Sequence, residues 1–519
     1  MSAGLVLSLD VGTQSARALL FDARGTLLAK AQEVFEPTYA SPQPGAAEQD
    51  PDVYWRALQD CCAALWREAP ARAGEVAAVA LTTQRASVVC CDAGGRVLRP
   101  AILWLDQRRA RHPPALGPAW NAAFRLLGAR ALIAHFQREA EANWLAENEP
   151  ALWRETAHYL LLSGWLSWKL CGEWVDSAAC QVGYLPFDYR RLRWAAPGDF
   201  KWRALAVRRG QLPELIAPGG RLGVLTRGAA GALGLPAGTP LIAAAADKAC
   251  EVLGSGVVEP DLAQLSFGTT ATINTVQPRY VEVQRLVPAY PAAQPQAWNT
   301  EIQIYRGFWM VSWFKREFAA QEARLAAERG VAVESLFDEL IRAVPAGAMG
   351  LTLQPYWSPG VREPGPEAKG AIIGFGDVHT RAHVYRAIVE GLVYGLRAGG
   401  EQIERKLGRR LRLLRVSGGG SQSDAAMQIT ADVFNRPAER PHVYETSGLG
   451  AAINAAVALG WHADHASAVR AMTRVGRRFE PDPATAKLYD ALYREVYRAM
   501  YGRLKPLYRR IRRITGYPA

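Results

Sequence analysis

The sequence predicts an α/β protein made of two related halves, residues 1–256 and 257–519. The chain is long enough for two large domains, and its 49% hydrophobic and 21% charged residues are typical of globular proteins with a substantial core. A strand–turn–strand pattern near the start returns at residues 262–273, about half a chain length later. Strands and helices then alternate in the second half, which indicates an α/β layer architecture. Two copies of one short pattern can also arise by chance, so duplication stays open on this evidence alone.

The first half begins with apolar runs bounded by turn residues, a pattern that favours strands. The polar turn Asp10–Ser15 separates the first two runs. A helix is expected from Pro51 to Glu68, because apolar residues recur at the helical period, Asp50 can cap the first turn and Pro51 fits the first helical position. The expected strands are residues 5–9, 17–22, 26–30, 76–81 and 240–247, and residues 115–220, which are rich in tryptophan, are expected to be mostly helical.

The second half is expected to follow a hinge at residues 254–260, where small residues and a proline interrupt the pattern. Its first strand–turn–strand unit turns at Gly268, as the first half turns at Gly12. Further along, the glycines 418–420 connect an expected strand to an expected helix. The later elements are a helix at residues 383–406, a strand at 411–417 and a helix at 423–434.

Composition and patterning exclude several classes of protein. A bilayer-spanning helix needs roughly 18–20 uncharged apolar residues, whereas the best candidate, Tyr159–Leu170, has only 12 residues and is followed by charge and glycine. The N-terminal residues lack the basic start and the small-residue cleavage site of a secretory signal. Seven cysteines without a CxxC pair fit reduced, buried thiols. We therefore expect a cytoplasmic protein without a membrane partner.

The net charge of +12 is concentrated at the C-terminus, where seven basic residues and no acidic residue follow from Arg498 onward. Tyr489, Tyr493, Tyr497 and Tyr501 recur every four residues, which predicts a helix with one apolar stripe docked on the body and a charged opposite face. Contact of that face with nucleic acid or another anionic surface is the alternative. Because aromatic and basic residues do not interleave elsewhere in the way that base stacking requires, we expect no nucleic-acid partner.

Two turns of small residues are candidate phosphate-binding sites. One contains Gly12, Thr13, Gln14 and Ser15, and the other contains Gly268, Thr269 and Thr270. Glycine lets backbone N–H groups approach an anion, and hydroxyl groups add donors. Asp10 ends a buried strand beside the first turn, and its carboxylate can hold Mg²⁺ through water. The alternative for each turn is an ordinary hairpin. The sequence has no GxxxxGK[ST] loop and no GxGxxG after a strand, so classical nucleotide motifs are absent.

Asp247 follows an apolar run where the chain turns into an expected helix, and strand ends are where α/β proteins place catalytic groups. A carboxylate at this position can accept a proton from a hydroxyl group. The alternative is that Asp247 is the N-cap of the following helix. The glycine turn at residues 418–420 also has two interpretations: it lets a base or ribose lie close to the backbone, or it is a plain strand-to-helix connection.

Together these segments resemble the FGGY family of carbohydrate kinases. Residues 10–17 are similar to the family's first phosphate motif, 266–270 to its second, 417–420 to its adenosine motif and 246–248 to the segment with the catalytic aspartate. Gln84-Arg85 and residues 104–108 resemble its sugar-side motifs. The most specific match is its C-terminal signature, which spans residues 370–390.

The resemblance implies two ribonuclease H-like domains of the actin-like ATPase type, with ATP and a small sugar or polyol meeting in a central cleft. It implies that Asp247 is the general base and that Asp10 holds Mg²⁺. The implied substrate-binding residues are Gln84, Arg85, Trp104, Asp106 and Asp247. The implied ATP-binding residues are Gly12, Thr13, Gln14, Ser15, Arg17, Gly268, Thr269, Thr270, Gly418, Gly419 and Gln422.

The implied activity is transfer of the γ-phosphate of ATP to a ketopentose such as xylulose, or to a polyol such as glycerol or erythritol. Gln84-Arg85 is similar to the glycerol kinase pattern, but Ala86 replaces the acidic residue that follows there. Since a missing acceptor leaves a substrate hydroxyl unpaired, we expect a longer polyol or a ketopentose. The alternative is a catalytically silent, actin-like regulatory or binding protein. A homodimer is compatible with both.

Overall fold

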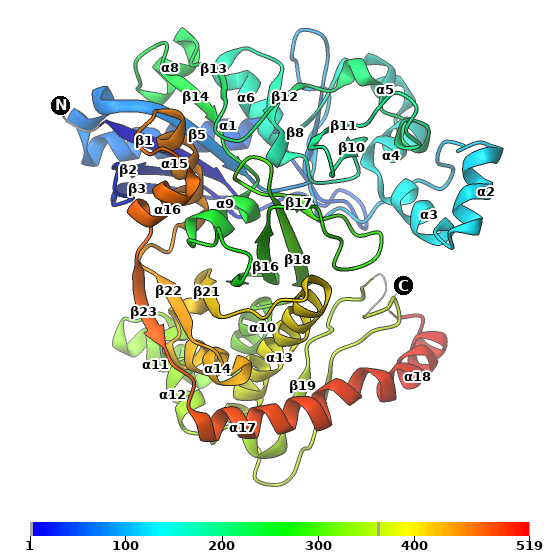
Figure 1. The fold of residues 1–519 in the computed structure, drawn as a ribbon, viewed down its shortest axis with the longest axis vertical. Helices are drawn as coiled ribbons and strands as arrows, with labels where there is room; N and C mark the ends of the chain where they lie inside the picture. Colours follow the sequence, from blue (N-terminus) through cyan, green and yellow to red (C-terminus); the bar gives the residue numbers. More distant parts are fainter. Residues whose placement is uncertain (1–3, 361–363, 518–519) are drawn as a thin grey trace.

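The computed structural model describes residues 4–360 and 364–517, which fold into two lobes (Figure 1). Each lobe is built on a mixed β-sheet. In spatial order the first sheet contains β13 (Arg221–Val224), β14 (Pro240–Ala243), β5 (Val76–Thr83), β1 (Leu5–Val11), β2 (Ser15–Phe21) and β3 (Leu27–Val34). The second contains β23 (Val475–Phe479), β22 (Ala438–Pro441), β21 (Leu413–Ser417), β15 (Leu262–Phe267), β16 (Ala271–Gln277), β18 (Trp298–Ile304) and β17 (Tyr290–Pro291).

Six strands have the same spatial order and directions in both sheets, although the edge strand β13 precedes β14 in the chain whereas β23 follows β22. In each, a hairpin is followed by a third antiparallel strand on one side, and a parallel strand joins the other side of the first strand. A second parallel strand and then an antiparallel strand extend each sheet further. The second sheet carries β17 as an additional edge strand. The repeated strand arrangement supports the predicted duplication, and the predicted class of two ribonuclease H-like α/β domains is confirmed.

The helices that position the site are α1 (Pro51–Glu68), α9 (Asp247–Gly254), α13 (Arg381–Leu407), α14 (Asp424–Phe434) and α15 (Thr446–Ala458). Successive side chains of a strand point to opposite faces of the sheet. On β1, Leu5, Leu7, Leu9 and Val11 pack with residues of α1, whereas Val6 packs with residues of α9 and α15. Asp10 is four residues after Val6 on the same strand, so both side chains lie on the same face of the sheet, the face that carries α9.

Helices α9 and α15 follow corresponding strands, β14 and β22, and they cross at two glycines. A Cβ on Gly254 would lie 1.9 Å from the carbonyl oxygen of Thr446, and a Cβ on Gly450 would lie 1.9 Å from that of Cys250. Only glycine permits this approach. Because α15 belongs to the second half of the sequence but packs on the first sheet, the halves are interlocked, and the boundary at residue 256 and the hinge at 254–260 stay predictions.

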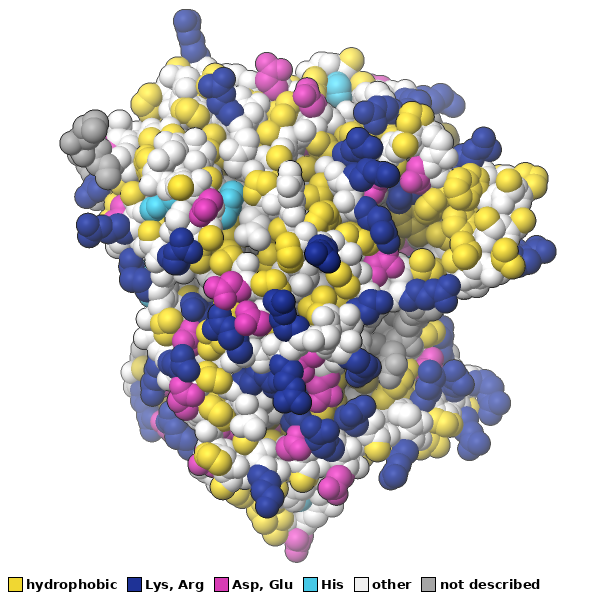
Figure 2. All heavy atoms as spheres, viewed as in Figure 1, with side chains coloured by type: hydrophobic (Ala, Val, Ile, Leu, Met, Phe, Trp, Pro, Cys, Tyr) yellow, Lys and Arg dark blue, Asp and Glu magenta, His cyan; other side chains and the backbone are white. Residues whose placement is uncertain are grey.

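Several expectations from the sequence are confirmed. Helix α1 has the predicted bounds, and Asp50 caps it by accepting a hydrogen bond from the backbone N–H of Asp52 at 3.0 Å. The tyrosine stripe of the C-terminal helices is docked: Tyr489, Tyr493 and Tyr497 are buried. It runs through α17 (Pro483–Ala491), a π-helical turn and α18 (Arg498–Thr515), whose basic side chains gather at the lower right of Figure 2.

Other expectations were wrong in detail. The first strand extends to Val11, so Asp10 lies within it rather than in the turn. The strand before Asp247 ends at Ala243. The apolar run 159–170 divides into a strand and a helix, and residues 115–220 contain further short strands beside the expected helices. Short apolar runs have no distinctive periodicity, so strands of two to four residues were missed.

The remaining elements surround these two sheets. In the first lobe they include β4 (Glu48–Gln49), β6 (Val88–Cys91), β7 (Ala101–Ile102), α2 (Pro118–Leu126), α3 (Arg130–Glu139), α4 (Glu141–Asn148), α5 (Pro150–Glu155), β8 (His158–Leu161), α6 (Leu162–Cys171), β9 (Val175–Ser177), β12 (Glu214–Ile216) and α8 (Arg227–Leu233). In the second half they include α10 (Trp309–Phe318), α11 (Ala320–Arg329), α12 (Phe337–Arg342), β19 (Thr352–Gln354), β20 (Ala371–Ile373) and α16 (His465–Met472). All seven cysteines are buried and free of disulfides, as predicted. Every helix within the described ranges is too short or too polar to cross a bilayer.

The close crossing of α9 and α15 predicts that a methyl group added at Gly450 destabilises the protein. Gly450→Ala should lower the free energy of unfolding by about 1–3 kcal/mol, because the added Cβ must displace buried backbone. The matched control is Gly231→Ala in α8, where a Cβ meets open space and helix propensity favours alanine by roughly 0.5–1 kcal/mol. Thermal unfolding measures both variants, and an unchanged or raised Tm for Gly450→Ala would contradict the packing described.

Candidate active site

Asp10 is the centre of a buried charge cluster at the end of β1. It is 4% exposed and lies directly across from Arg17 on β2, with 3.4 Å between Asp10 Oδ2 and Arg17 Nη1. Arg17 Nε lies 3.4 Å from Glu445 Oε2, and Lys30 also pairs with Glu445. Burial raises the pKa of Asp10 to about 7, although Arg17 opposes this shift, and the negative charges of Asp247 and Glu445 add to it. Asp10 and Asp247 therefore share one electrostatic environment.

The Asp10 carboxylate fits the role of a magnesium ligand. A divalent cation would relieve the cost of ionising a carboxyl group that is buried near other carboxylates. In phosphoryl-transfer sites Mg²⁺ is held by one or two carboxylates together with substrate phosphates and water. Within the described ranges, His, Cys, Asp and Glu side chains do not gather in groups of three or more as an all-protein metal site. Asp10 would thus supply the protein's share of a site completed by a nucleotide.

The first phosphate turn is joined to two of the predicted substrate-side residues. The Gly12 N–H donates to the carbonyl oxygen of Ser15 at 3.0 Å, which closes the turn. Thr13 Oγ1 donates to Gln84 Oε1 at 2.7 Å and accepts from Trp104 Nε1 at 2.9 Å. Gln14 is exposed, whereas Ser15 is buried and its hydroxyl accepts a hydrogen bond from Gln32. The turn and the Trp104 loop thus form one connected surface.

The second phosphate turn is connected to the start of α10. The carbonyl oxygens of Gly268 and Thr269 accept hydrogen bonds from the N–H groups of Phe308 and Gly307, at 3.0 and 2.8 Å. Thr269 is exposed, and the Thr270 hydroxyl donates to the carbonyl oxygen of Tyr305 at 3.2 Å. The backbone of this turn is therefore fixed while its Thr269 side chain stays accessible.

The glycine turn after β21 lies against the second phosphate turn. Gly418 has a φ of +85°, and a Cβ there would meet the Phe267 backbone at 2.9 Å. Gly419 and Gln422 are exposed in the short 3₁₀ helix that precedes α14. Gly420 lies under Phe308, whose ring its Cβ would meet at 2.4 Å. This turn needs glycine for its own packing, so the sequence pattern alone could not decide between a connection and a nucleotide contact.

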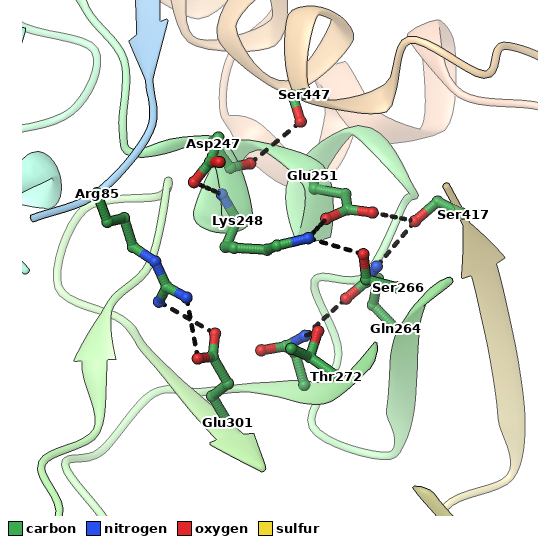
Figure 3. Close-up of polar contacts among 11 residues, drawn as sticks. Arg85, Asp247, Lys248, Glu251, Gln264, Ser266, Thr272, Glu301, Ser417 and Ser447 are labelled. Atoms are coloured by element: carbon green, nitrogen blue, oxygen red, sulfur yellow. Dashed lines mark hydrogen bonds and ion pairs between the residues drawn. The ribbon is translucent and has the colours of Figure 1, made fainter. Parts of the chain in front are cut away.

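Asp247 is the first residue of α9. The N-cap position is occupied by Ala246, which makes no side-chain capping bond, so the N-cap alternative for Asp247 was wrong. Asp247 Oδ1 accepts a hydrogen bond from the N–H of Lys248 at 2.7 Å, and Ser447 Oγ donates to the Asp247 carbonyl oxygen at 3.3 Å (Figure 3). Burial raises the pKa of Asp247 above its ordinary value, and the charges of Lys248 and Arg85 counteract that shift.

A polar network connects α9 to the second sheet (Figure 3). Lys248 Nζ donates to Glu251 Oε2 and to Ser266 Oγ, both at 2.8 Å. Ser417 Oγ donates to Glu251 Oε1 at 2.8 Å and accepts from Gln264 Nε2 at 2.8 Å. Burial acts to lower the pKa of Lys248, but the carboxylates of Glu251 and Asp247 raise it, so the ammonium stays charged. The network fixes the helix that carries Asp247 against the strands that carry the second phosphate and glycine turns.

Arg85 reaches across the lobes to Glu301 on β18 (Figure 3). The pair is bidentate: Arg85 Nη1 lies 3.1 Å from Glu301 Oε2, and Nη2 lies 3.0 Å from Oε1. The guanidinium also lies 5.3 Å from the ring centroid of Tyr290. The Arg85 guanidinium thus lies beside Asp247 and is held in position by Glu301 of the second sheet.

Asp106 contacts neighbouring loop residues of the first lobe. Its Oδ2 accepts from the N–H of Ala47 at 2.9 Å, and both of its oxygens contact Arg108, which also pairs with Glu48. These bonds hold the loop that carries Trp104, whose side chain is 40% exposed. Contact of Asp106 or Trp104 with a substrate stays a prediction.

Four charged residues of the site were missed as candidates in the sequence. Lys248 and Glu251 are three positions apart beside Asp247, a helical spacing that could have indicated an ion pair. Glu301 and Glu445 have no comparable signal, because their partners Arg85 and Arg17 lie hundreds of positions away in the chain. Only the arrangement of the two lobes brings them to the site.

The site thus combines two candidate phosphate-binding turns from different lobes with two carboxylates. Asp10 can hold a cation, and Asp247 can accept a proton. A model of the FGGY family of carbohydrate kinases matches the chain, with its N-terminal domain over residues 5–254 and its C-terminal domain over residues 263–459. The chain belongs to the FGGY family of carbohydrate kinases. Members of this family are phosphotransferases with an alcohol group as acceptor, so the predictions of the family and of a kinase are confirmed.

Full-length relatives support this assignment. A glycerol kinase of Dechloromonas aromatica is 31% identical, with 95% of this chain and 96% of that protein covered. The uncharacterized sugar kinase YgcE of Escherichia coli is 28% identical, covering 96% of this chain and 93% of the relative. The crystal structure of xylulose kinase from Rhodospirillum rubrum superposes with a TM-score of 0.78 at 27% identity, covering 97% of this chain and all of that chain.

The raised pKa of Asp10 predicts how this FGGY chain responds to pH. Between the ordinary value of 3.8 and about 7, the folded chain holds more protons at Asp10 than the unfolded chain. Raising the pH through this window therefore lowers the free energy of unfolding. Asp10→Asn removes this loss, so the variant should gain stability over wild type, on the order of 2 kcal/mol, as the pH rises from about 5 to about 8.

Thermal unfolding without nucleotide, measured across that pH range, tests this expectation. Asp60→Asn, at an exposed position on α1, is the matched control and should follow wild type. If the Tm of wild type and of Asp10→Asn changed with pH in the same way, the pKa of Asp10 would not be raised in the folded chain.

Proposed function

We propose that this FGGY chain is an ATP-dependent kinase that transfers the γ-phosphate of ATP to a hydroxyl of a small sugar or polyol. The observation that carries the proposal is the placement of Asp247. It begins the helix that Lys248 links to Ser266, beside the second phosphate turn, and it interacts electrostatically with Asp10 beside the first. A base next to two phosphate-type turns is what hydroxyl phosphorylation requires.

In this proposal Asp247 takes the proton of the acceptor hydroxyl as its oxygen bonds to the γ-phosphorus and the bond to the β-phosphate oxygen breaks, so ADP leaves. The first turn, Arg17 and the second turn hold the phosphates, and Gly418, Gly419 and Gln422 border the adenosine. Mg²⁺ bound at Asp10 would neutralise charge on the phosphates. Phosphoryl transfer needs mainly positioning and electrostatic stabilisation from the protein.

The acceptor is proposed to be a ketopentose or a polyol longer than glycerol. Relatives named as glycerol kinase and xylulose kinase support this range of small polyhydroxylated compounds. Ala86 supplies no acceptor next to Arg85, which argues against a site shaped for glycerol alone. The protein is proposed to act in the cytoplasm, and a homodimer stays open.

Asp247→Ala should reduce turnover by about 10²- to 10⁴-fold, the range of general base catalysis, while ATP binding is retained. Asp247→Asn keeps the side chain's size and should behave the same way. The assay is ADP release coupled to an optical readout with glycerol, erythritol, xylulose, ribulose and gluconate as acceptors, and a fluorescent nucleotide reports ATP affinity.

Asp60→Asn is the control in this assay and should keep the wild-type rate. A near-wild-type rate for Asp247→Ala would exclude Asp247 as the base. Wild-type protein that binds ATP but releases no ADP with any acceptor would instead support the catalytically silent alternative.

A further inference from the structure

A small recess opens between the lobes beside Asp247. Its polar lining comes from Arg85 and Lys248 of the first half and from Tyr290, Asn299 and Glu301 of the second. It has room for about one hydroxyl-sized group rather than a whole sugar. Since Asp247 precedes Lys248 directly and interacts electrostatically with Arg85, a group in this recess would belong to the molecule whose hydroxyl Asp247 deprotonates.

Glu301 has hydrogen-bonding capacity left in this recess. Its carboxylate is 5% exposed, and each of its oxygens accepts one bond from Arg85. A carboxylate oxygen can accept a second bond, so two acceptor positions remain. Arg85 orients the Glu301 carboxylate, because a bidentate pair fixes the plane of both groups. A hydroxyl donor placed here would gain a charge-assisted hydrogen bond.

Asn299 provides independent evidence for a ligand. It lies two residues before Glu301 on β18, so both side chains are on the same face of the strand. Asn299 is 4% exposed, and its Oδ1 has no hydrogen-bond partner among the described residues. A buried acceptor without a partner costs free energy, and a hydroxyl group in the recess would satisfy it.

We propose that Glu301 and Asn299 are specificity-determining residues that accept hydrogen bonds from hydroxyls of the acceptor substrate, while Arg85 donates to it. This inference rests on the proposed kinase function. It places acceptor recognition partly on the second sheet, because Ala86 beside Arg85 offers no polar side chain. The substrate class is a polyhydroxylated chain with at least one hydroxyl beyond the one that is phosphorylated.

Glu301→Gln tests the proposal, because it keeps the size of the side chain but removes its charge. We expect the KM for the best acceptor to rise by about 10- to 100-fold, the loss typical of a hydrogen bond to a charged group, while the KM for ATP stays unchanged. Asn299→Ala should raise the acceptor KM in the same direction by a smaller factor. Glu328→Gln, an exposed position on α11, is the matched control.

Deoxy analogues of the acceptor separate recognition from a purely structural link between the lobes. If Glu301 binds a substrate hydroxyl, one analogue lacking that hydroxyl should bind wild type and Glu301→Gln equally well, because the two losses are not additive. A structural link predicts the same fold-loss for every analogue, or a changed ATP affinity with an unchanged acceptor KM. Either of these results would overturn the proposal.

Acceptor binding measured by tryptophan fluorescence distinguishes this inference from the kinase proposal. Turnover by wild type with an unchanged acceptor KM in Glu301→Gln contradicts the inference alone. Saturable acceptor binding without turnover, lost in Glu301→Gln, contradicts the kinase proposal alone. Wild type that neither binds nor phosphorylates any acceptor of the panel overturns both.

Discussion

The buried carboxylate of Asp10 and the partly buried carboxylate of Asp247 interact electrostatically where the lobes meet, and such like charges are stabilised by nearby cations. Arg17, Lys248 and Arg85 supply three of these positive charges, and they form ion pairs with Glu445, Glu251 and Glu301, respectively. The ion pairs of Arg17 and Arg85 join the two halves of the chain. The charge arrangement of the site and the relative placement of the lobes therefore depend on the same contacts.

The duplicated architecture explains how one chain produces this arrangement. In each sheet, a turn of small residues connects the two strands of the first hairpin. The corresponding helices α9 and α15 pack on one another through Gly254 and Gly450. That crossing brings the start of α9, with Asp247, onto the face of the first sheet that carries Asp10. Lys248 then reaches Ser266 beside the second turn. The close packing of α9 and α15 at Gly254 and Gly450 thus helps to place Asp247 relative to Asp10 and to the second turn.

Much of this could be predicted from local sequence. Helix α1, the two hairpins and the docked tyrosine stripe follow from periodicity and turn residues, and the position of Asp247 at the end of an apolar run made it a candidate base. The short strands within residues 115–220 could not be recognised, because runs of a few apolar residues carry no period. Glu301 and Glu445 could not be found either, since a charged residue on a strand or before a helix becomes part of a site only through distant partners.

The central claim is that turns from both lobes form one phosphate site around Asp247. Hydrogen exchange of the full chain, with and without a non-hydrolysable ATP analogue and Mg²⁺, measures this directly. The account predicts that the amides of residues 12–14 and 268–270 are both protected when the analogue binds. Protection confined to one of the two turns, with saturating analogue bound, would contradict a site shared between the lobes.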